Sequence, residues 1–138
     1  MALLEPETPQ IDIRELSPLA LAFVGDGVYE VLVRSHIVGR SRLAPGKLHA
    51  AAVEYVSARA QFAALAAVGP LLTEAEQAVV LRGRNASKAS VAKHASPEEY
   101  RASTALECLF GWLYLRGETG RIDALFAAIC EAKEAAGA

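Results

Sequence analysis

The segment from Ser17 to Val38 reads SPLALAFVGDGVYEVLVRSHIV, and its pattern decides the fold class. A serine followed by Pro18 is typical of the N-cap and first turn of an α-helix. Apolar residues then recur at helical spacing as far as Val38, and Gly39 is typical of a helix end. The segment therefore predicts a long α-helix near the start of the chain.

Four further helices are predicted after this one, by helical periodicity and by end signals. Thr73 with Glu76, and Ser96 with Glu99, have the spacing of capping boxes. The predicted helices cover residues 45–68 (alanine-rich), 73–84, 96–116 and 122–135. No segment alternates polar and apolar residues as a strand would. We expect an all-α fold of about five helices, with residues 1–15 as a loose lead-in and residues 16–138 as a single helical domain.

Composition limits the class of protein. The chain has 138 residues, of which 53% are hydrophobic and 22% charged, so it can bury a core and is expected to fold as one domain. It has no apolar run long enough to span a membrane and no basic start followed by a hydrophobic signal core. Its two cysteines, Cys108 and Cys130, fit neither a disulfide framework nor a zinc site. We therefore expect a cytoplasmic protein with no membrane association.

The net charge of −2 hides an uneven distribution. Residues 31–53 and residues 77–97 each hold four basic residues and no acidic one. The basic residues of these two acid-free windows are Arg34, Arg40, Arg42, Lys47, Arg82, Arg84, Lys88 and Lys93. If the fold places both windows on one face, that face can bind a phosphate backbone. The alternative is two unrelated cationic stretches on solvated surfaces.

Asp26 is an unusual residue for the middle of the first helix. It lies in phase with Leu19, Phe23 and Val33, so we expect its side chain to point toward the apolar face. Gly25 and Gly27 flank it at a cost of about 1 kcal/mol each relative to alanine, which favours close approach of another backbone or a ligand. Two structural alternatives remain: a turn that splits the helix, with Asp26 as a cap, or a pair between Asp26 and a buried arginine.

Glu107 repeats this situation in the helix predicted at residues 96–116. Phe110 and Tyr114 share its mostly uncharged face. A buried charge is costly unless it is paired or binds a metal ion. The structural alternative is a buried salt bridge from Glu107 to Arg34 or Arg101.

If the two helices cross so that Asp26 and Glu107 meet, the pair suits a hard divalent cation such as Mg²⁺, which can activate water for phosphodiester hydrolysis. The run Arg82-Gly83-Arg84-Asn85 is interpreted as a flexible position carrying two guanidinium groups and an amide that can bind phosphate, sugar or base. Its alternative is a helix C-terminus with basic residues placed favourably against the helix dipole.

Four segments carry a resemblance to a known family. They read LALAFVGDGVYE (19–30), KLHAAAVEYVSARAQ (47–61), RGRNA (82–86) and STALECLFGWLYL (103–115). In this order they resemble the ribonuclease III catalytic domain, specifically its short form, the mini ribonuclease III family. The resemblance implies an all-α homodimeric endoribonuclease that depends on Mg²⁺, with Mn²⁺ as a substitute, and cleaves double-stranded RNA to leave 5′-phosphate and 3′-hydroxyl ends. For the short form it also implies maturation of the 23S (large-subunit) ribosomal RNA precursor, with the need for an accessory ribosomal protein left open.

The resemblance assigns roles by position. Asp26 matches the family's catalytic, metal-binding aspartate, and Glu107 matches its metal-binding glutamate. Ala22 and Thr104 stand where the classical enzyme has two more carboxylates, as in the short form. We expect no separate RNA-binding domain, so the proposed RNA contacts are Arg82, Arg84, Asn85, Lys88 and Lys93. The alternative functions are a non-catalytic helical RNA-binding or assembly module and a helical protein-interaction domain.

Overall fold

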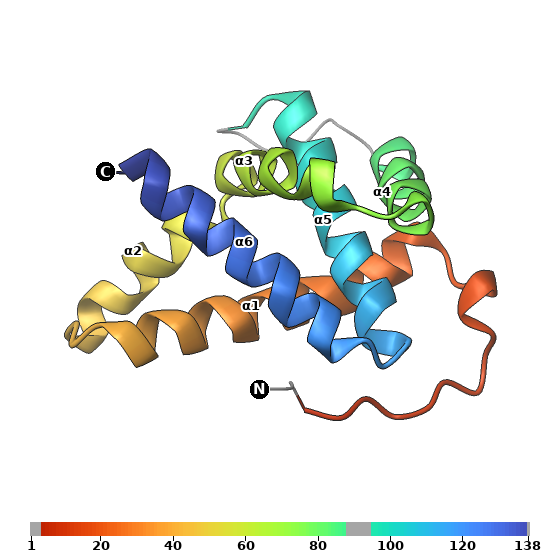
Figure 1. Ribbon diagram of the computed structural model, residues 1–138, viewed down its shortest axis with the longest axis horizontal. Coiled ribbons are helices and arrows are strands. Elements are labelled where there is room, and N and C mark those ends of the chain that lie inside the picture. The colour runs from red at the N-terminus through yellow and green to blue at the C-terminus, as the bar shows by residue number, and fades with distance from the viewer. Residues whose placement is uncertain (1–3, 88–94, 138) are drawn as a thin grey trace.

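The computed structural model describes residues 4–87 and 95–137, and all regular structure in these ranges is helical (Figure 1). The α-helices are α1 (Pro18–Arg40), α2 (Pro45–Val56), α3 (Ala58–Val68), α4 (Glu74–Ala86), α5 (Pro97–Leu115) and α6 (Thr119–Gly137). Two short 3₁₀ helices, η1 (Ile13–Glu15) and η2 (Gly69–Leu71), precede α1 and α4. The predicted all-α class is confirmed. No helix within the described ranges is long and apolar enough to cross a membrane.

Side-chain caps fix where the helices begin. The Ser17 hydroxyl accepts a hydrogen bond from the backbone N–H of Ala20, as the sequence predicts for the start of α1. Both predicted capping boxes form, at Thr73 before α4 and at Ser96 before α5. These local signals therefore place the starts of α1, α4 and α5 correctly.

The prediction of one helix over residues 45–68 is wrong, because the chain breaks at Ser57 into α2 and α3. Ser57 has extended dihedral angles (φ −60°, ψ 156°), and its hydroxyl accepts from the N–H of Ala60. Serine offers the backbone this alternative to a continuous helix. The surrounding alanines favour helix on either side of the break and so conceal it from a propensity argument.

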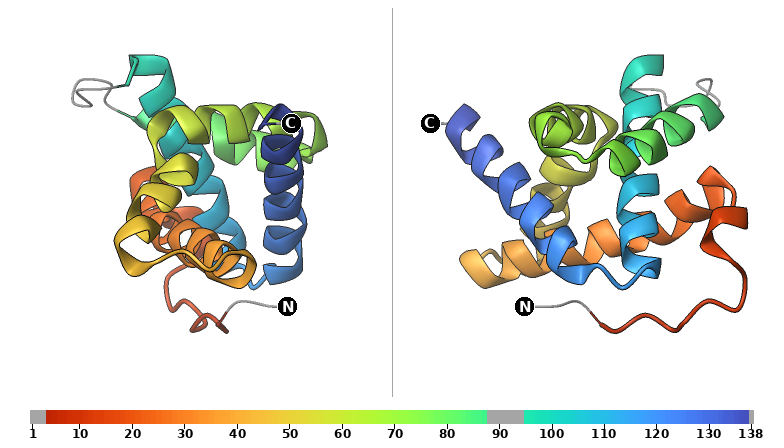
Figure 2. Two further views of the ribbon diagram at one scale, coloured as in Figure 1. Left: turned by 90° about the vertical axis from the view of Figure 1, so that its left-hand side faces the viewer. Right: turned by 45° about the vertical axis from the view of Figure 1, so that its right-hand side comes forward.

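Helix α5 is the centre of the fold. It packs against α1, α3, α4 and α6, and most of its residues from Ala102 to Leu113 are buried. Helix α1 crosses beneath it, while α3 and α4 lie along its upper part (Figure 1). The two further views in Figure 2 show the same crossing of α1 and α5. Residues of α5 therefore meet residues from three earlier parts of the chain.

Two glycines allow α1 and α5 to touch backbone to backbone. A methyl group on Gly25 would overlap the carbonyl oxygen of Glu107 and lie 2.9 Å from the backbone nitrogen of Gly111. A methyl group on Gly111 would likewise overlap the carbonyl oxygen of Leu21. The expected close approach of a backbone is thus found at Gly25, whereas nothing lies within 4 Å of a methyl group built on Gly27. This crossing brings Asp26 to Glu107.

An ion pair between a buried carboxylate and a half-buried arginine joins α4 to α6. Glu76 is 4% exposed, and Arg121 donates to both of its carboxylate oxygens, at 2.9 and 2.8 Å. The same carboxylate closes the capping box with Thr73. The Arg121 hydrogen bonds hold the pKa of Glu76 below its usual value. Glu76 is therefore a structural carboxylate.

Candidate active site

Asp26 and Glu107 come together where α1 crosses α5. Glu107 is half-buried, and its Oε2 atom accepts a hydrogen bond of 3.1 Å from Nε2 of Gln61 on α3. The Asp26 carboxyl group on α1 is near enough to Glu107 to raise the pKa of Glu107, by its charge and by side-chain hydrogen bonding. The convergence that the sequence analysis made conditional on a helix crossing is thus present.

The surroundings of Glu107 disfavour its ionised form. Burial is the largest cause and, although the Gln61 hydrogen bond acts the other way, the pKa of Glu107 rises to about 7. The charge of Asp26 and a hydrogen bond with it raise this pKa further, and Glu30 adds a smaller contribution. A carboxyl group whose pKa is raised this far by burial and by acidic neighbours is typical of a functional site.

Asp26 shares a helix face with Leu19 and Phe23, but this part of the face is not covered by the rest of the chain. Asp26 is exposed, as are Leu19 by 50% and Phe23 by 84%, whereas Val33, two turns later in the same phase, is buried. Helical periodicity identifies an apolar face but does not say whether the same chain covers it. Helix α1 runs unbroken through Asp26, so the alternative of a turn at this residue is wrong.

The salt-bridge alternative for Glu107 is wrong too. Arg34 donates instead to Glu30, one turn earlier on α1, at 2.8 Å. Arg101 is exposed and lies almost two turns before Glu107 on α5. Among the described residues, Gln61 donates a hydrogen bond to the Glu107 carboxylate, and Asp26 raises its pKa.

The positions of the two missing carboxylates are occupied by groups with other roles. Ala22 is buried in a small core cluster with Leu21 and Cys108. The hydroxyl of Thr104 donates to the carbonyl oxygen of Tyr100 at 3.2 Å and lies 3.2 Å from the Ser87 hydroxyl. Neither side chain adds a carboxylate to the site.

The donor set of the site fits Mg²⁺. This ion takes one or two carboxylates in many proteins and completes its shell with water and substrate phosphate. Within residues 4–87 and 95–137, no group of three or more histidine, cysteine, aspartate or glutamate side chains is arranged to hold a metal ion. At the crossing of α1 and α5, the side chains that would hold the ion are those of Asp26 and Glu107.

Sequence reasoning missed Gln61 as a site residue. Its side chain is 3% exposed and reaches Glu107 across 46 positions of sequence. The residue ends the second family-like segment, but nothing in a single sequence links it to Glu107. The only local signal is Ser57, whose capping position starts the helix that carries Gln61.

The basic residues predicted to bind RNA lie on α4 or outside the described residues. Arg82, Arg84 and Asn85 are exposed in the last two turns of α4. Burial raises the pKa of Cys108 to about 11, and the charge of Arg82 opposes this shift, which places Arg82 near the residue that follows Glu107. Lys88 and Lys93 lie outside the described residues.

The interpretation of Gly83 as a flexible position is wrong. Gly83 is buried inside α4, and a methyl group on it would lie 2.9 Å from Cβ of Cys108 and 3.0 Å from Cα of Ala105. This glycine lets α4 pack closely on α5. The run Arg82–Asn85 is therefore the C-terminal part of a helix, the alternative considered for it, with Arg84 in the last turn.

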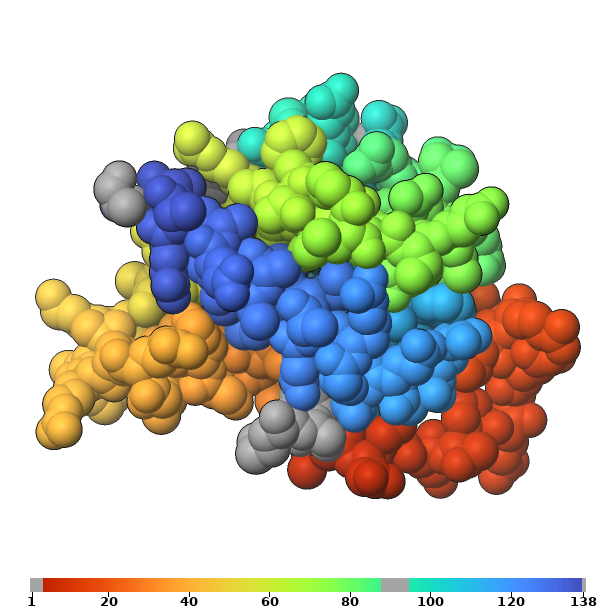
Figure 3. All heavy atoms as spheres, in the orientation of Figure 1, coloured from red at the N-terminus to blue at the C-terminus, as the bar shows by residue number. Residues whose placement is uncertain are grey.

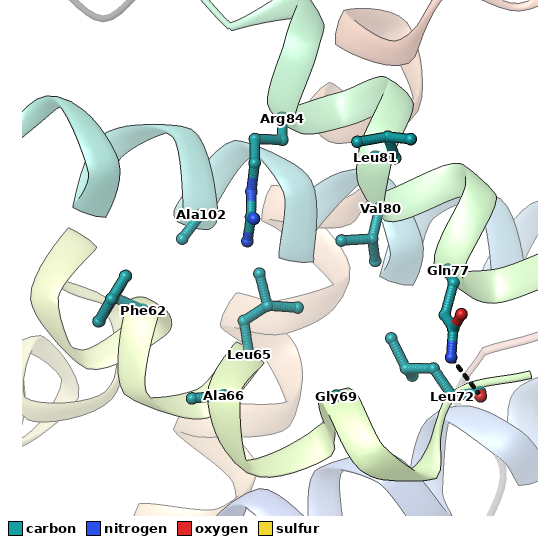
Figure 4. Close-up of a pocket in the computed structure, with 10 residues that line it drawn as sticks. All are labelled: Phe62, Leu65, Ala66, Gly69, Leu72, Gln77, Val80, Leu81, Arg84 and Ala102. Carbon is teal, nitrogen blue, oxygen red and sulfur yellow. Dashed lines mark hydrogen bonds between the residues drawn. The ribbon is translucent and has the colours of Figure 1, made fainter.

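A surface pocket of ≈ 480 Å³ lies between α3 and α4 and does not contain the carboxylate pair. Arg84 extends into it from α4, over the apolar side chains of Phe62, Leu65 and Ala102 (Figure 4). Gln77, at the other end of the pocket, donates to the carbonyl oxygen of Leu72 at 3.2 Å. The residues that line this pocket include no carboxylate, so the pocket, unlike the Asp26–Glu107 site, offers no acidic ligand for a hard cation.

The two acid-free windows lie apart. The first covers the end of α1 and the start of α2, which project from the body of the molecule on the left of Figure 3, whereas α4 lies at its upper right. The described parts of the two windows therefore lie at opposite ends of this view and are not side by side.

The raised pKa of Glu107 predicts how stability depends on pH in the metal-free protein. Because the folded state holds this proton more tightly than the unfolded state, the stabilisation is complete below about pH 4.5 and is lost as the pH rises through about 7. The melting temperature of the wild type should therefore fall, relative to that of the Glu107→Gln variant, as the pH rises from 5 to 8. Thermal unfolding in the presence of a chelator measures this difference, and parallel curves for the two proteins would contradict it.

Comparison with known proteins defines the class. Residues 19–118 match the family model of the ribonuclease III domain. The chain belongs to the ribonuclease III family and is an endoribonuclease, which hydrolyses phosphodiester bonds in RNA. Family membership supports the enzyme over both alternatives without catalytic activity.

Within this class the chain is similar to proteins named Mini-ribonuclease 3. It is 48% identical to that of Brevibacillus brevis, covering 77% of this chain and 79% of the relative. It is 45% identical to that of Symbiobacterium thermophilum, covering 84% and 89%. A crystal structure of a Fusobacterium nucleatum protein matches with a TM-score of 0.80 and 25% identity, covering 88% of this chain and 99% of that one.

Proposed function

We propose that this enzyme is a cytoplasmic, Mg²⁺-dependent endoribonuclease that cleaves double-stranded regions of the large-subunit ribosomal RNA precursor and leaves 5′-phosphate and 3′-hydroxyl ends. The observation that carries the proposal is the convergence of Asp26 and Glu107 at the crossing of α1 and α5. The similarity to proteins named Mini-ribonuclease 3 supports the short form of the family.

Asp26 and Glu107 act as the ligands in this mechanism. A bound Mg²⁺ would stabilise charge on the phosphate and lower the pKa of a bound water. Asp26, exposed on α1, presents its carboxylate to solvent and to the RNA backbone, while Glu107 anchors the site from the buried side. With a cation bound, Glu107 would hold it in the ionised form, because a nearby positive charge favours the carboxylate against the burial that raises its pKa.

The exposed apolar face of α1 supports a homodimer. Phe23 and Leu19 lie one and two turns before Asp26, and a phenyl ring that is 84% exposed is typical of an interaction surface. A second copy would cover this face and place one site near each RNA strand.

The Phe23→Asp variant should therefore shift the protein from dimer to monomer, because a carboxylate in an apolar contact is costly. Light scattering with size-exclusion chromatography measures the mass. Val38→Asp is the matched control, since Val38 is also exposed on α1 (64%) but lies three turns beyond Asp26. A Phe23→Asp protein that remains dimeric would exclude this face as the interface.

We assign RNA contacts to Arg82, Arg84 and Asn85 on α4 and to Lys88 and Lys93 after it. Replacing both lysines with alanine should weaken duplex binding and flatten its salt dependence by up to about two units of log–log slope. Arg40 and Arg42, in the other acid-free window, provide a comparison pair whose replacement should change the slope less. An unaltered slope in the lysine variant would show that these side chains do not contact phosphates.

The choice of substrate is tested by mapping RNA ends. The purified protein is incubated with precursor and mature large-subunit ribosomal RNA in Mg²⁺ or Mn²⁺, with and without the ribosomal proteins that bind this RNA. New 5′-phosphate ends should appear in double-stranded parts of the precursor. Binding of duplex RNA without release of fragments would contradict the proposal.

A further inference from the structure

Gln61 makes two hydrogen bonds with one amide nitrogen. Its Nε2 atom donates to the carbonyl oxygen of Val56 at 3.0 Å and to Oε2 of Glu107 at 3.1 Å. The carbonyl oxygen of Val56 can only accept, so the amide cannot be turned around without facing oxygen to oxygen at Val56. The orientation of the Gln61 amide is therefore determined by its surroundings.

The bond to Val56 follows from the break between α2 and α3. Ser57 interrupts the helix, and Gln61 is the fourth residue after this cap. Gln77 repeats the arrangement on α4: it is the fourth residue after the cap Thr73 and donates to the carbonyl oxygen of Leu72 (Figure 4). The bond to the carbonyl group is thus a local feature that both helix starts share, whereas the bond to Glu107 belongs to Gln61 alone.

The remaining oxygen of Gln61 is also informative. Its Oε1 atom is buried and has no hydrogen-bond partner among the described residues. A buried amide oxygen without a donor is costly, so an apolar residue would be preferred here if packing were the only requirement. The presence of a glutamine at this buried position is explained if Glu107 requires the hydrogen bond from its amide N–H group.

We propose that Gln61 is a positioning residue, which holds the Glu107 carboxylate in the orientation that binds the divalent cation. This inference rests on the proposed function of Asp26 and Glu107 as metal ligands. Groups that orient metal ligands by hydrogen bonds change metal affinity by about 10–100-fold when they are removed. Gln61 is anchored at Val56, so it restrains the Glu107 carboxylate from α3, whereas Asp26 approaches it from α1.

The test measures Mn²⁺ binding to the RNA-free protein by electron paramagnetic resonance. Gln61→Met keeps an unbranched side chain of similar size but removes both donors, and it should weaken Mn²⁺ binding about 10–100-fold. Gln77→Met, which removes the matching local hydrogen bond on α4, should leave the affinity unchanged. In cleavage assays, Gln61→Met should raise the Mg²⁺ concentration needed for half-maximal activity. The fold-change in this concentration should be larger than the fold-decrease in kcat at saturating Mg²⁺.

A double-mutant cycle separates positioning from a structural role. If Gln61 acts through Glu107, adding Gln61→Met to Glu107→Gln should cost no further Mn²⁺ affinity. Additive losses, or equal affinity in wild type and Gln61→Met, would overturn the inference. If the methionine variant does not fold, Gln61→Asn is measured, because its shorter amide cannot reach both Val56 and Glu107 and the same loss is expected. A wild-type protein that binds no Mn²⁺ would instead refute the proposed function.

Discussion

Asp26→Asn should lower Mg²⁺-dependent cleavage of double-stranded RNA by about 10³-fold or more. Asparagine keeps the size of the side chain but loses the charge that a hard cation requires, and a loss of about 4 kcal/mol of transition-state stabilisation corresponds to this factor. Asp26 is exposed and its charge disfavours the ionised form of Glu107, so the variant should fold at least as stably as the wild type. Single-turnover cleavage of a labelled duplex measures the effect.

The matched control for this variant is Glu30→Gln. Glu30 lies one turn after Asp26 on α1 and also acts electrostatically on Glu107, but it forms a surface ion pair with Arg34. Its replacement should change the rate by less than tenfold, since exposed pairs of this kind contribute little. Binding of the duplex should survive in both variants. Unchanged turnover in Asp26→Asn would remove the catalytic role of this residue.

Gly25→Ala should be the most damaging substitution for folding. The added methyl group would overlap the Glu107 carbonyl oxygen, and a methyl group has no rotamer that avoids it, so the backbones of α1 and α5 must separate. We expect a loss of at least about 3 kcal/mol, which for a domain of this size lowers the melting temperature by roughly 10 °C or more. Thermal unfolding followed by circular dichroism measures it.

Gly27→Ala, two residues away, should have the opposite effect on stability. Nothing lies within 4 Å of a methyl group at this position, and Gly27 is inside the same helix. Alanine should therefore stabilise the protein by about 0.5–1 kcal/mol, through helix propensity alone. Equal melting temperatures for Gly25→Ala and Gly27→Ala would show that the crossing is looser than described.

The fold was predictable wherever its determinants are local. The caps at Ser17, Thr73 and Ser96 give their helix starts directly, because a hydroxyl three residues before an N–H donor is a feature of sequence. The break at Ser57 uses the same chemistry but stands among strong helix formers, and propensity then favours the wrong answer.

The two acidic residues of the candidate site could be selected from the sequence, but their exposure and their neighbours could not. Carboxylates in apolar helices single out Asp26 and Glu107, but the exposure of Asp26 depends on what covers α1, which lies outside a periodicity argument. Gln61 could not be found because its contact spans 46 positions. Gly83 was misinterpreted because a glycine that permits packing and a glycine that permits flexibility look alike in sequence.

The glycine crossing has a consequence for any attempt to alter this enzyme. The peptide group of Glu107 abuts α1 at Gly25, while its side chain faces Asp26. The gap between the two acidic groups is therefore set by how closely the two main chains approach. A substitution that widens this approach would change cation preference as well as melting behaviour, so screens for heat resistance should include metal selectivity as a routine measurement.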